Sequence, residues 1–303
     1  MLDPHRPVLT PAGIRHPRVQ EFLAVKRRPS GGVPTGPVAL AGMWMIGQAL
    51  AAGVKLQAVF VCPALMDTAE GLALTSAAMS MGADGYEVSQ RVLCRLAGRD
   101  RPDGITALGE VLRRTLGDIR IGSRTRVVIA DGWDLPGNLG TLIRCADGAR
   151  ASGVLVVEQG FGLSHPLVVR ASMGAALTMP VVAVGRAAAR RWLHHHAFRI
   201  VAADPAGSCS YRDVNYRGPL AIVIGSERRG LGPDWLAAAD SIAAIPMLGS
   251  CDSLNAAVAG ALLLYEVLAH DSHNPDRADP ESARGGRQPV QPRSEPNSEE
   301  SPT

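Results

Sequence analysis

The chain has 303 residues, a formal net charge of +3, 46% hydrophobic residues and only 4% aromatic residues. This apolar content is enough for one large core or two modest ones, and because the length exceeds that of a usual single domain, we expect two domains. The five cysteines form no Cys-x-x-Cys pair and their number is odd, which argues against a disulfide framework and a zinc site. No run of about eighteen uncharged apolar residues occurs, so we expect a cytoplasmic protein that does not enter a membrane.

The first half of the chain alternates short helices with apolar strands. Residues 1–16 are rich in proline, and we expect them to be flexible. A helix is predicted from Pro17 to the Pro-Ser-Gly-Gly break at 29–32. Further on, the pattern predicts strands at 38–42, 57–63 and 86–89, with helices at 43–53 and 71–82. Residues 17–120 are therefore predicted to form a small α/β domain.

The second half shows the same alternation more strongly. Apolar runs predict strands at 127–131, 154–158, 180–184, 199–204, 220–225 and 241–246. Helices are predicted between or after them at 138–151, 165–176, 186–196, 233–239 and 254–269. Strands that are apolar throughout and separated by helices favour a mostly parallel sheet covered on both faces, here over residues 121–270. Residues 271–303 are rich in proline and poor in aliphatic side chains, so we predict a disordered tail.

Two arginine-rich stretches are candidates for phosphate contacts. They are Lys26-Arg27-Arg28 and the run from Arg113 and Arg114 to Arg126. An ordinary solvated face explains the same residues equally well. His194, His195 and His196 follow one another directly and so point to different sides of a helix, which does not match the spacing of metal ligands.

Three polar loops follow apolar strands, at 131–147, 225–235 and 245–266. Ligands of open α/β sheets bind where such loops gather, so the three could build one site. The Gly-x-Gly-x-x-Gly and P-loop signatures are absent, which disfavours a Rossmann dehydrogenase and a P-loop enzyme. Taken singly, the loop residues have plainer explanations: Asn138 and Asn255 as helix caps, Arg144 as a solvated arginine, and Glu227 as the partner of a neighbouring arginine.

In this order and spacing, the loops resemble the signature motifs of the SpoU group in the SPOUT superfamily of RNA methyltransferases. The matching residues are Asn138, Gly140 and Arg144 in the first loop; Gly225, Glu227, Gly230 and Leu231 in the second; and Ile245 to Met247 with Ser253 to Asn255 in the third. The resemblance covers about residues 125–270. Ser226 stands where the family more commonly has Asn. More weakly, the N-terminal half resembles the small ribosomal-protein-like domain that binds substrate in related proteins.

The resemblance implies an α/β fold in which a C-terminal trefoil-knotted SPOUT methyltransferase domain follows a small N-terminal substrate-binding domain. It implies an enzyme that transfers a methyl group from S-adenosylmethionine to a ribose 2′-hydroxyl of RNA, with large-subunit ribosomal RNA as the first candidate substrate and transfer RNA as the second. It also implies a homodimer formed through the knotted domains.

Residue roles follow from the same resemblance. The cofactor is expected to contact Ala202 or Ala203, Gly225, Ile245, Met247, Ser253 and Leu254. The catalytic set is expected to be Arg144, Asn138, Glu227 and Asn255, with Arg27, Arg28, Arg113 and Arg114 binding the RNA. Because a guanidinium does not readily lose a proton, we expect Arg144 to hold phosphate or ribose and to stabilise developing alkoxide charge. Asn138 and Glu227 would orient Arg144 or the ribose.

Two other functions remain open at this point. A non-catalytic RNA-binding protein could keep the fold, although the intact polar residues of the three loops speak against it. An S-adenosylmethionine-dependent transferase of small molecules would bind the cofactor without affinity for RNA.

Overall fold

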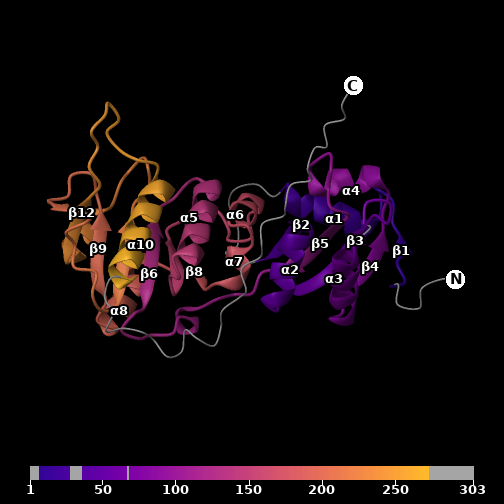
Figure 1. The fold of residues 1–303 in the computed structure, drawn as a ribbon, viewed down its shortest axis with the longest axis horizontal. Coiled ribbons are helices and arrows are strands. Elements are labelled where there is room, and N and C mark those ends of the chain that lie inside the picture. Colours follow the sequence, from indigo (N-terminus) through magenta and orange to yellow (C-terminus); the bar gives the residue numbers. More distant parts are fainter. Residues whose placement is uncertain (1–6, 28–35, 67, 273–303) are drawn as a thin grey trace, which may run out of the picture.

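The computed structural model describes residues 7–27, 36–66 and 68–272. Two lobes lie side by side along the long axis, the N-terminal one in indigo and purple and the C-terminal one in magenta to yellow (Figure 1). The predicted tail falls outside the described residues from position 273 onward, and Arg28 falls outside them too. None of the helices within these described ranges is long and apolar enough to cross a membrane.

The N-terminal lobe contains a five-stranded mixed sheet in the order β1-β4-β3-β5-β2. Its strands are β1 (Thr10–Pro11), β2 (Pro37–Ala41), β3 (Lys55–Val61), β4 (Asp84–Glu87) and β5 (Ile105–Glu110). Its helices are α1 (Pro17–Lys26), α2 (Met43–Ala51), α3 (Ala69–Ser80) and α4 (Gln90–Ala97). The expectation that all of residues 1–16 are flexible is wrong for β1, because Thr10 pairs with Tyr86 and the Ala12 N–H donates to the Glu87 carbonyl at 2.8 Å.

The C-terminal lobe is built on a seven-stranded sheet in the order β10-β12-β9-β11-β6-β7-β8, in which every pair of neighbours is parallel. Its strands are β6 (Arg126–Asp131), β7 (Gly153–Val157), β8 (Val181–Ala183), β9 (Arg199–Ala203), β10 (Cys209–Ser210), β11 (Leu220–Ile224) and β12 (Ser241–Ala244). Its helices are α5 (Pro136–Gly148), α6 (Pro166–Ala171), α7 (Ala175–Thr178), α8 (Arg186–His195), α9 (Pro233–Ala238) and α10 (Ala256–Ser272).

Helices cover both faces of this sheet. Val128 and Ala130 of β6 belong to the core formed with α5 and α10, whereas Val127 and Ile129 belong to the core formed with α8 and α9. Successive residues of a strand point to opposite faces, so the four central positions of β6, from Val127 to Ala130, are all apolar. The predicted parallel sheet covered on both faces is confirmed. The knot that the resemblance implies stays a prediction.

One predicted helix, 165–176, is wrong as a single element. The chain breaks between α6 and α7 because Met173 and Gly174 adopt left-handed backbone conformations, with φ of 52° and 95°. Such angles end a right-handed helix.

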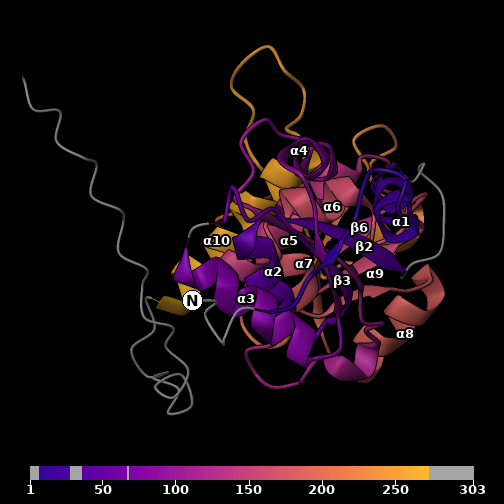
Figure 2. The ribbon, with the colours of Figure 1, turned by 90° about the vertical axis from the view of Figure 1, so that its right-hand side faces the viewer.

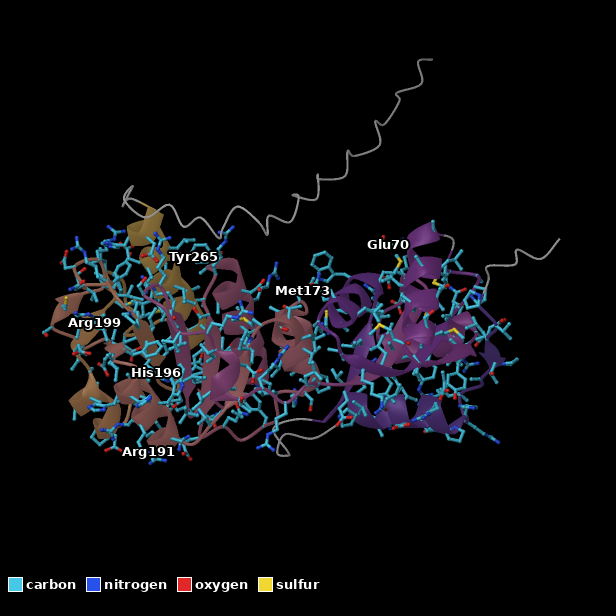
Figure 3. The ribbon with its side chains drawn as sticks, turned by 90° about the horizontal axis from the view of Figure 1, so that it is seen from below. Glu70, Met173, Arg191, His196, Arg199 and Tyr265 are labelled. Carbon is cyan, nitrogen blue, oxygen red and sulfur yellow. The ribbon has the colours of Figure 1, made fainter. Side chains whose placement is uncertain are left out.

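This break lies at the boundary of the two lobes, where Figure 3 labels Met173. Val169 of α6 and Leu177 of α7 are buried in the hydrophobic core of the N-terminal lobe. The indole Nε1 of Trp44 on α2 donates to the Met173 carbonyl at 2.9 Å. The lobes therefore share apolar core and a specific hydrogen bond.

Candidate functional site

The three polar loops meet at the carboxyl edge of the parallel sheet. They follow β6, β11 and β12, and the turn after β9 lies between the last two because β9 separates β12 from β11. The loop that joins β12 to α10 rises beyond the helices as an orange arch in Figures 1 and 2. Parallel strands end at one edge, so segments more than a hundred residues apart are brought together.

The carboxylate of Glu227 connects the three loops. One of its oxygens, Oε1, accepts from the side-chain Nδ2 of Asn138 at 2.8 Å and of Asn255 at 2.6 Å. The backbone N–H of Ala256 lies 3.4 Å from the same oxygen. A single carboxylate thus joins the starts of α5 and α10 to the end of β11.

The two asparagines differ in their roles. The Oδ1 of Asn255 accepts from the N–H groups of Ala257 and Val258 at 3.0 and 3.3 Å, so Asn255 caps α10 and also donates to Glu227. Asn138 does not cap α5, because the helix already begins at Pro136 and Asn138 lies within it. Its amide is directed at Glu227, and the cap interpretation of Asn138 is wrong.

A pocket opens beside Glu227. It is lined by Ala203, Asp204, Pro205, Ile224, Gly225, Ser226, Glu227, Gly230, Ala243, Ile245, Met247, Ser253, Leu254, Ala256 and Ala259. Six of the seven positions expected to contact the cofactor are in this lining. The exception is Ala202, which is fully buried in the core under α8 and α9, so Ala203 is the member of that pair that lines the pocket.

Glycine at position 225 is required by a close approach of the backbone. A Cβ there would lie 2.2 Å from the carbonyl carbon and oxygen of Gly230. The neighbouring Ser226 is buried, its carbonyl accepts from the Gly230 N–H at 2.9 Å, and its Oγ accepts from the Arg229 N–H at 3.2 Å. Ser226 therefore serves the same tight turn, which shapes one wall of the pocket.

Arg144 stands apart from these groups. It lies six residues after Asn138 on α5, which places it about 9 Å further along the axis and about 240° around it. Its side chain is exposed, and Asn138 and Glu227 bind each other instead. Neither Asn138 nor Glu227 forms a hydrogen bond with Arg144 within one protomer, and the expectation that they orient Arg144 or the ribose, partly across a dimer interface, stays a prediction. Arg144 also affects Cys145, since burial raises the pKa of that thiol while the nearby guanidinium opposes the rise.

A second group of polar side chains, not anticipated from the sequence, supports the same loops. Asp131, the last residue of β6, is buried and accepts from the Nε1 of Trp235 at 2.8 Å and from Nε and Nη2 of Arg186 at 3.1 Å each. This pairing raises the pKa of Arg186. The buried Nε1 of Trp133 donates to the Ile224 carbonyl at 3.0 Å. The indoles of Trp133 and Trp235 thus connect the loops after β6 and β11. Tryptophan is mainly apolar, so the sequence did not indicate that these two residues make polar contacts.

Of the arginines expected to bind RNA, the structure describes Arg27, Arg113 and Arg114, and none of these three lines the pocket. The linker after β5 reaches the sheet where β6 begins, at the edge opposite the pocket, and it runs along the lower side of Figure 1. Arg113 is exposed there and Arg114 lies 3.7 Å from Asp118. Arg126 is buried and binds both carboxylate oxygens of Asp271 at 3.0 and 3.2 Å, so its expected phosphate contact is wrong.

Arg27 ends α1 in the N-terminal lobe and is exposed. The histidines at 194–196 lie at the end of α8, where the ring centroids of His195 and His196 are 4.7 Å apart. Among the residues that the structure describes, no group of three His, Cys, Asp or Glu side chains could hold a metal ion.

Comparisons with known proteins agree with this architecture. Residues 125–265 match the SpoU rRNA Methylase family, and residues 34–107 match the MRM3-like substrate binding domain. A solved RNA 2′-O ribose methyltransferase shares 32% sequence identity with a TM-score of 0.73, over 88% of this chain and 100% of that one. The AdoMet-bound rRNA methyltransferase from Sinorhizobium meliloti shares 27% identity with a TM-score of 0.76, over 86% and 98% of the two chains.

Among curated relatives, a putative TrmH family tRNA/rRNA methyltransferase of Staphylococcus haemolyticus is 38% identical over 46% of this chain and 57% of its own length. The first three such relatives are matched over only 57% to 61% of their lengths. The 23S rRNA (guanosine-2′-O-)-methyltransferase RlmB of Ralstonia nicotianae is 32% identical over 58% of this chain and 73% of its own length. The chain therefore belongs to the SpoU rRNA methylase family.

Proposed function

We propose that this protein transfers a methyl group from S-adenosylmethionine to a ribose 2′-hydroxyl of ribosomal RNA, with transfer RNA as the second candidate substrate. The observation that carries the proposal is the convergence of Asn138, Glu227 and Asn255 beside a pocket at the carboxyl edge of the sheet. The relatives named as rRNA 2′-O-methyltransferases support both the reaction and the substrate.

The pocket residues fit S-adenosylmethionine. Small side chains and glycine leave backbone exposed for the polar edge of an adenine, and Ile245, Met247 and Leu254 offer apolar walls for its faces. The lining contains the carboxylates of Asp204 and Glu227 and neither lysine nor arginine, which suits a cationic sulfonium. When bound there, the cofactor supplies an electrophilic methyl group for an in-line displacement.

The protein's own residues then have three tasks. Positioning of the ribose hydroxyl in line with the methyl falls to the polar edge formed by Asn138, Glu227 and Asn255. Arg144 binds the phosphate or ribose and stabilises negative charge that develops on the 2′-oxygen, since a guanidinium donates hydrogen bonds and keeps its proton. Phosphate or water takes up the hydroxyl proton.

Arg144 cannot complete the site of its own protomer from its observed position, and we propose that it acts in a dimer. Val258, Leu262 and Tyr265 form an exposed apolar stripe on α10 at the i, i+4 and i+7 positions, 46%, 39% and 50% exposed. Figure 3 labels Tyr265 on this helix. The side chain of Tyr265 reaches Gly148 on α5, the helix that carries Arg144. Burial of the stripe against a second copy would bring Arg144 to the partner's pocket.

The reaction is tested by incubating purified protein with labelled S-adenosylmethionine and ribosomal subunits. The wild type should transfer label to RNA, and Arg144→Ala should lose at least about a hundredfold in rate while still binding the cofactor. Arg191→Ala is the matched control, since Arg191 is exposed on α8 at the opposite face of the sheet (Figure 3). Cofactor binding with no label in any RNA would instead favour the small-molecule transferase.

The dimer is tested by combining two variants that are each impaired in activity. Arg144→Ala and Glu227→Ala, co-expressed with different tags and purified as heterodimers, should recover up to half of the wild-type activity if Arg144 acts across the interface. Leu262→Asp should shift the wild-type dimer toward monomer in sedimentation experiments and abolish activity. A wild-type monomer that transfers methyl groups would refute the dimer proposal.

A further inference from the structure

Trp44 is the most exposed tryptophan of the described residues. Trp44 on α2 is 54% exposed, whereas Trp133 and Trp235 are 3% and 0% exposed. Trp44 lies at the junction of the two lobes, where its Nε1 donates to the Met173 carbonyl at 2.9 Å. This bond satisfies the polar edge of the indole and fixes the orientation of the ring, so what remains for solvent is largely an apolar, π-rich surface.

The turn that accepts this hydrogen bond is held in a special conformation. Met173 has φ of 52°, which is uncommon for a residue with a side chain. Gly174 has φ of 95°, and a Cβ there would lie 3.0 Å from the Cβ and Cγ of Gln48 on α2. The turn and α2 are therefore in close contact, and the Trp44 ring is held by tertiary structure instead of moving freely.

Positive charge lies next to this turn. Arg170 is exposed in the last turn of α6, and the Met173 N–H donates to its carbonyl at 3.2 Å. The pKa of Lys26 is lowered by burial and by the charge of Arg170, which shows that the two cations share one neighbourhood. Lys26 donates to the carbonyls of Arg95 and Leu96, so Arg170 is the cation that is free to meet a phosphate.

The same surface leads toward Arg144. A Cβ on Gly140 of α5 would lie 2.5 Å from the Val168 carbonyl and 2.7 Å from the Ala171 Cβ of α6. Gly140 therefore faces α6, while a Cβ on Gly148 would lie 2.8 Å from the Tyr265 hydroxyl of α10, so the exposed Arg144, four residues from each, projects outward between α6 and α10. Helix α5 packs against α6, and α2 packs against α7, which follows α6 in the chain, so Arg144, Arg170 and Trp44 lie on a connected series of helices. Neighbouring helices pack about 8–10 Å apart, so the series spans a few nucleotides of extended RNA.

We infer that Trp44 is a stacking platform for an unpaired base of the RNA substrate, with Arg170 holding an adjoining phosphate. This inference rests on the proposed function in taking RNA as the substrate, and it assigns the lobe junction as a binding subsite distinct from the pocket. An indole face accepts any base, because every base has a π-face, so the subsite contributes affinity and selects single-stranded RNA over duplex.

The experiment measures RNA binding without cofactor or methyl transfer. Wild type, Trp44→Ala, Trp44→Phe and Met81→Ala are titrated with a fluorescent single-stranded adenosine dodecamer and with a twelve-base-pair RNA duplex. Met81 is the matched control, since it is 53% exposed in the same lobe but outside the junction. Circular dichroism and thermal unfolding verify that each variant is folded.

Trp44→Ala should weaken binding of the single strand by about 5- to 150-fold, which corresponds to about 1–3 kcal/mol for one stacked base. Trp44→Phe keeps an aromatic face without the Nε1 donor and should stay within about threefold to fivefold of wild type. Duplex binding should be unchanged in all variants. Arg170→Ala should weaken the single strand and also reduce the salt dependence of binding.

The inference is overturned if Trp44→Ala binds the single strand as tightly as the wild type does. It is also overturned if Trp44→Phe and Trp44→Ala lose the same affinity, because the Nε1 hydrogen bond and not stacking would then determine binding. Failure of methyl transfer with a large Trp44→Ala effect on binding would refute the proposed reaction and leave the stacking subsite in place. Methyl transfer together with unchanged RNA binding by Trp44→Ala would support the proposed reaction and refute the stacking subsite.

Discussion

Replacing Glu227 by alanine removes the acceptor shared by the two asparagines. The Nδ2 groups of Asn138 and Asn255 lose contacts of 2.8 and 2.6 Å, and the Ala256 N–H loses a longer one. Hydrogen bonds to a charged group contribute about 1.5–3 kcal/mol each, and the exposure of Glu227 places these near the lower end. If the contacts hold the site together, loss of the two shorter ones should cost about 3 kcal/mol of transition-state stabilisation, or about 150-fold in kcat/KM.

Glu227→Gln separates geometry from charge. The amide oxygen of glutamine can accept from both asparagines, so this variant should keep several times the activity of Glu227→Ala. Glu70→Gln is the control for the loss of one negative charge, because Glu70 is exposed on α3 in the other lobe (Figure 3). Adding Asn138→Ala to Glu227→Ala should cost little more, since the two residues act through one contact.

The assay is labelled methyl transfer at saturating cofactor with varied RNA, together with thermal unfolding of each variant. Full activity of Glu227→Ala would refute the role given to these contacts. Equal loss in Glu227→Ala and Glu227→Gln would show that the charge, and not the arrangement of acceptors, is what the reaction needs.

Three further predictions concern the framework of the site. Gly225→Ala should raise the Kd for S-adenosylmethionine at least about tenfold in calorimetry, because its Cβ meets Gly230 backbone at 2.2 Å, while Gly232→Ala in the same loop, with open space around it, should not. Gly140→Ala should lower the free energy of unfolding by about 1–3 kcal/mol in urea, and an unchanged value would contradict the tight contact between α5 and α6. Gly137→Ala is its control, because a Cβ on Gly137 would have no atom within 4 Å. Asp131→Asn leaves Arg186 without its ion pair and should cost about 1–3 kcal/mol in the same assay, with unchanged stability as the contrary outcome.

The sequence was sufficient to predict six of the seven described strands of the C-terminal lobe, but not the two-residue β10 or the order in which the strands pair. The six predicted strands are mainly apolar runs, as a sheet covered on both faces requires, whereas Cys209 and Ser210 of β10 form no such run. Which strands are neighbours could not be predicted: β6 pairs with β11, and the paired residues Arg126 and Leu220 are more than ninety positions apart in the sequence. The spacing of apolar residues predicts that a segment is a strand, but it does not indicate which other strand it pairs with.

The site residues were predicted by motif, and their contacts were not. Gly225, Glu227 and Asn255 were expected at one site and are found together, but the single carboxylate that joins Asn138 to Asn255 became visible only in the fold. Arg126 shows why charge alone misleads: its partner Asp271 is 145 residues away, so nothing local distinguishes this buried arginine from the exposed ones around it.

Backbone conformation also escaped the sequence patterns. The apolar residues from 165 to 176 have a helical spacing, yet the left-handed residues at 173 and 174 divide the segment and create the acceptor for Trp44. Asp131, Trp133 and Trp235 fall in the predicted loops after two strands, and their hydrogen bonds depend on which loops the order of the strands brings together.

The most direct test of the proposed reaction is the position of the transferred methyl group. Ribosomal subunits are incubated with the protein and S-adenosylmethionine that carries a deuterated methyl, and the RNA is digested to nucleosides for mass spectrometry. We expect one nucleoside with the deuterated methyl on the ribose 2′-oxygen, absent with Arg144→Ala. Label on a base, or no label in RNA from any subunit, would contradict it.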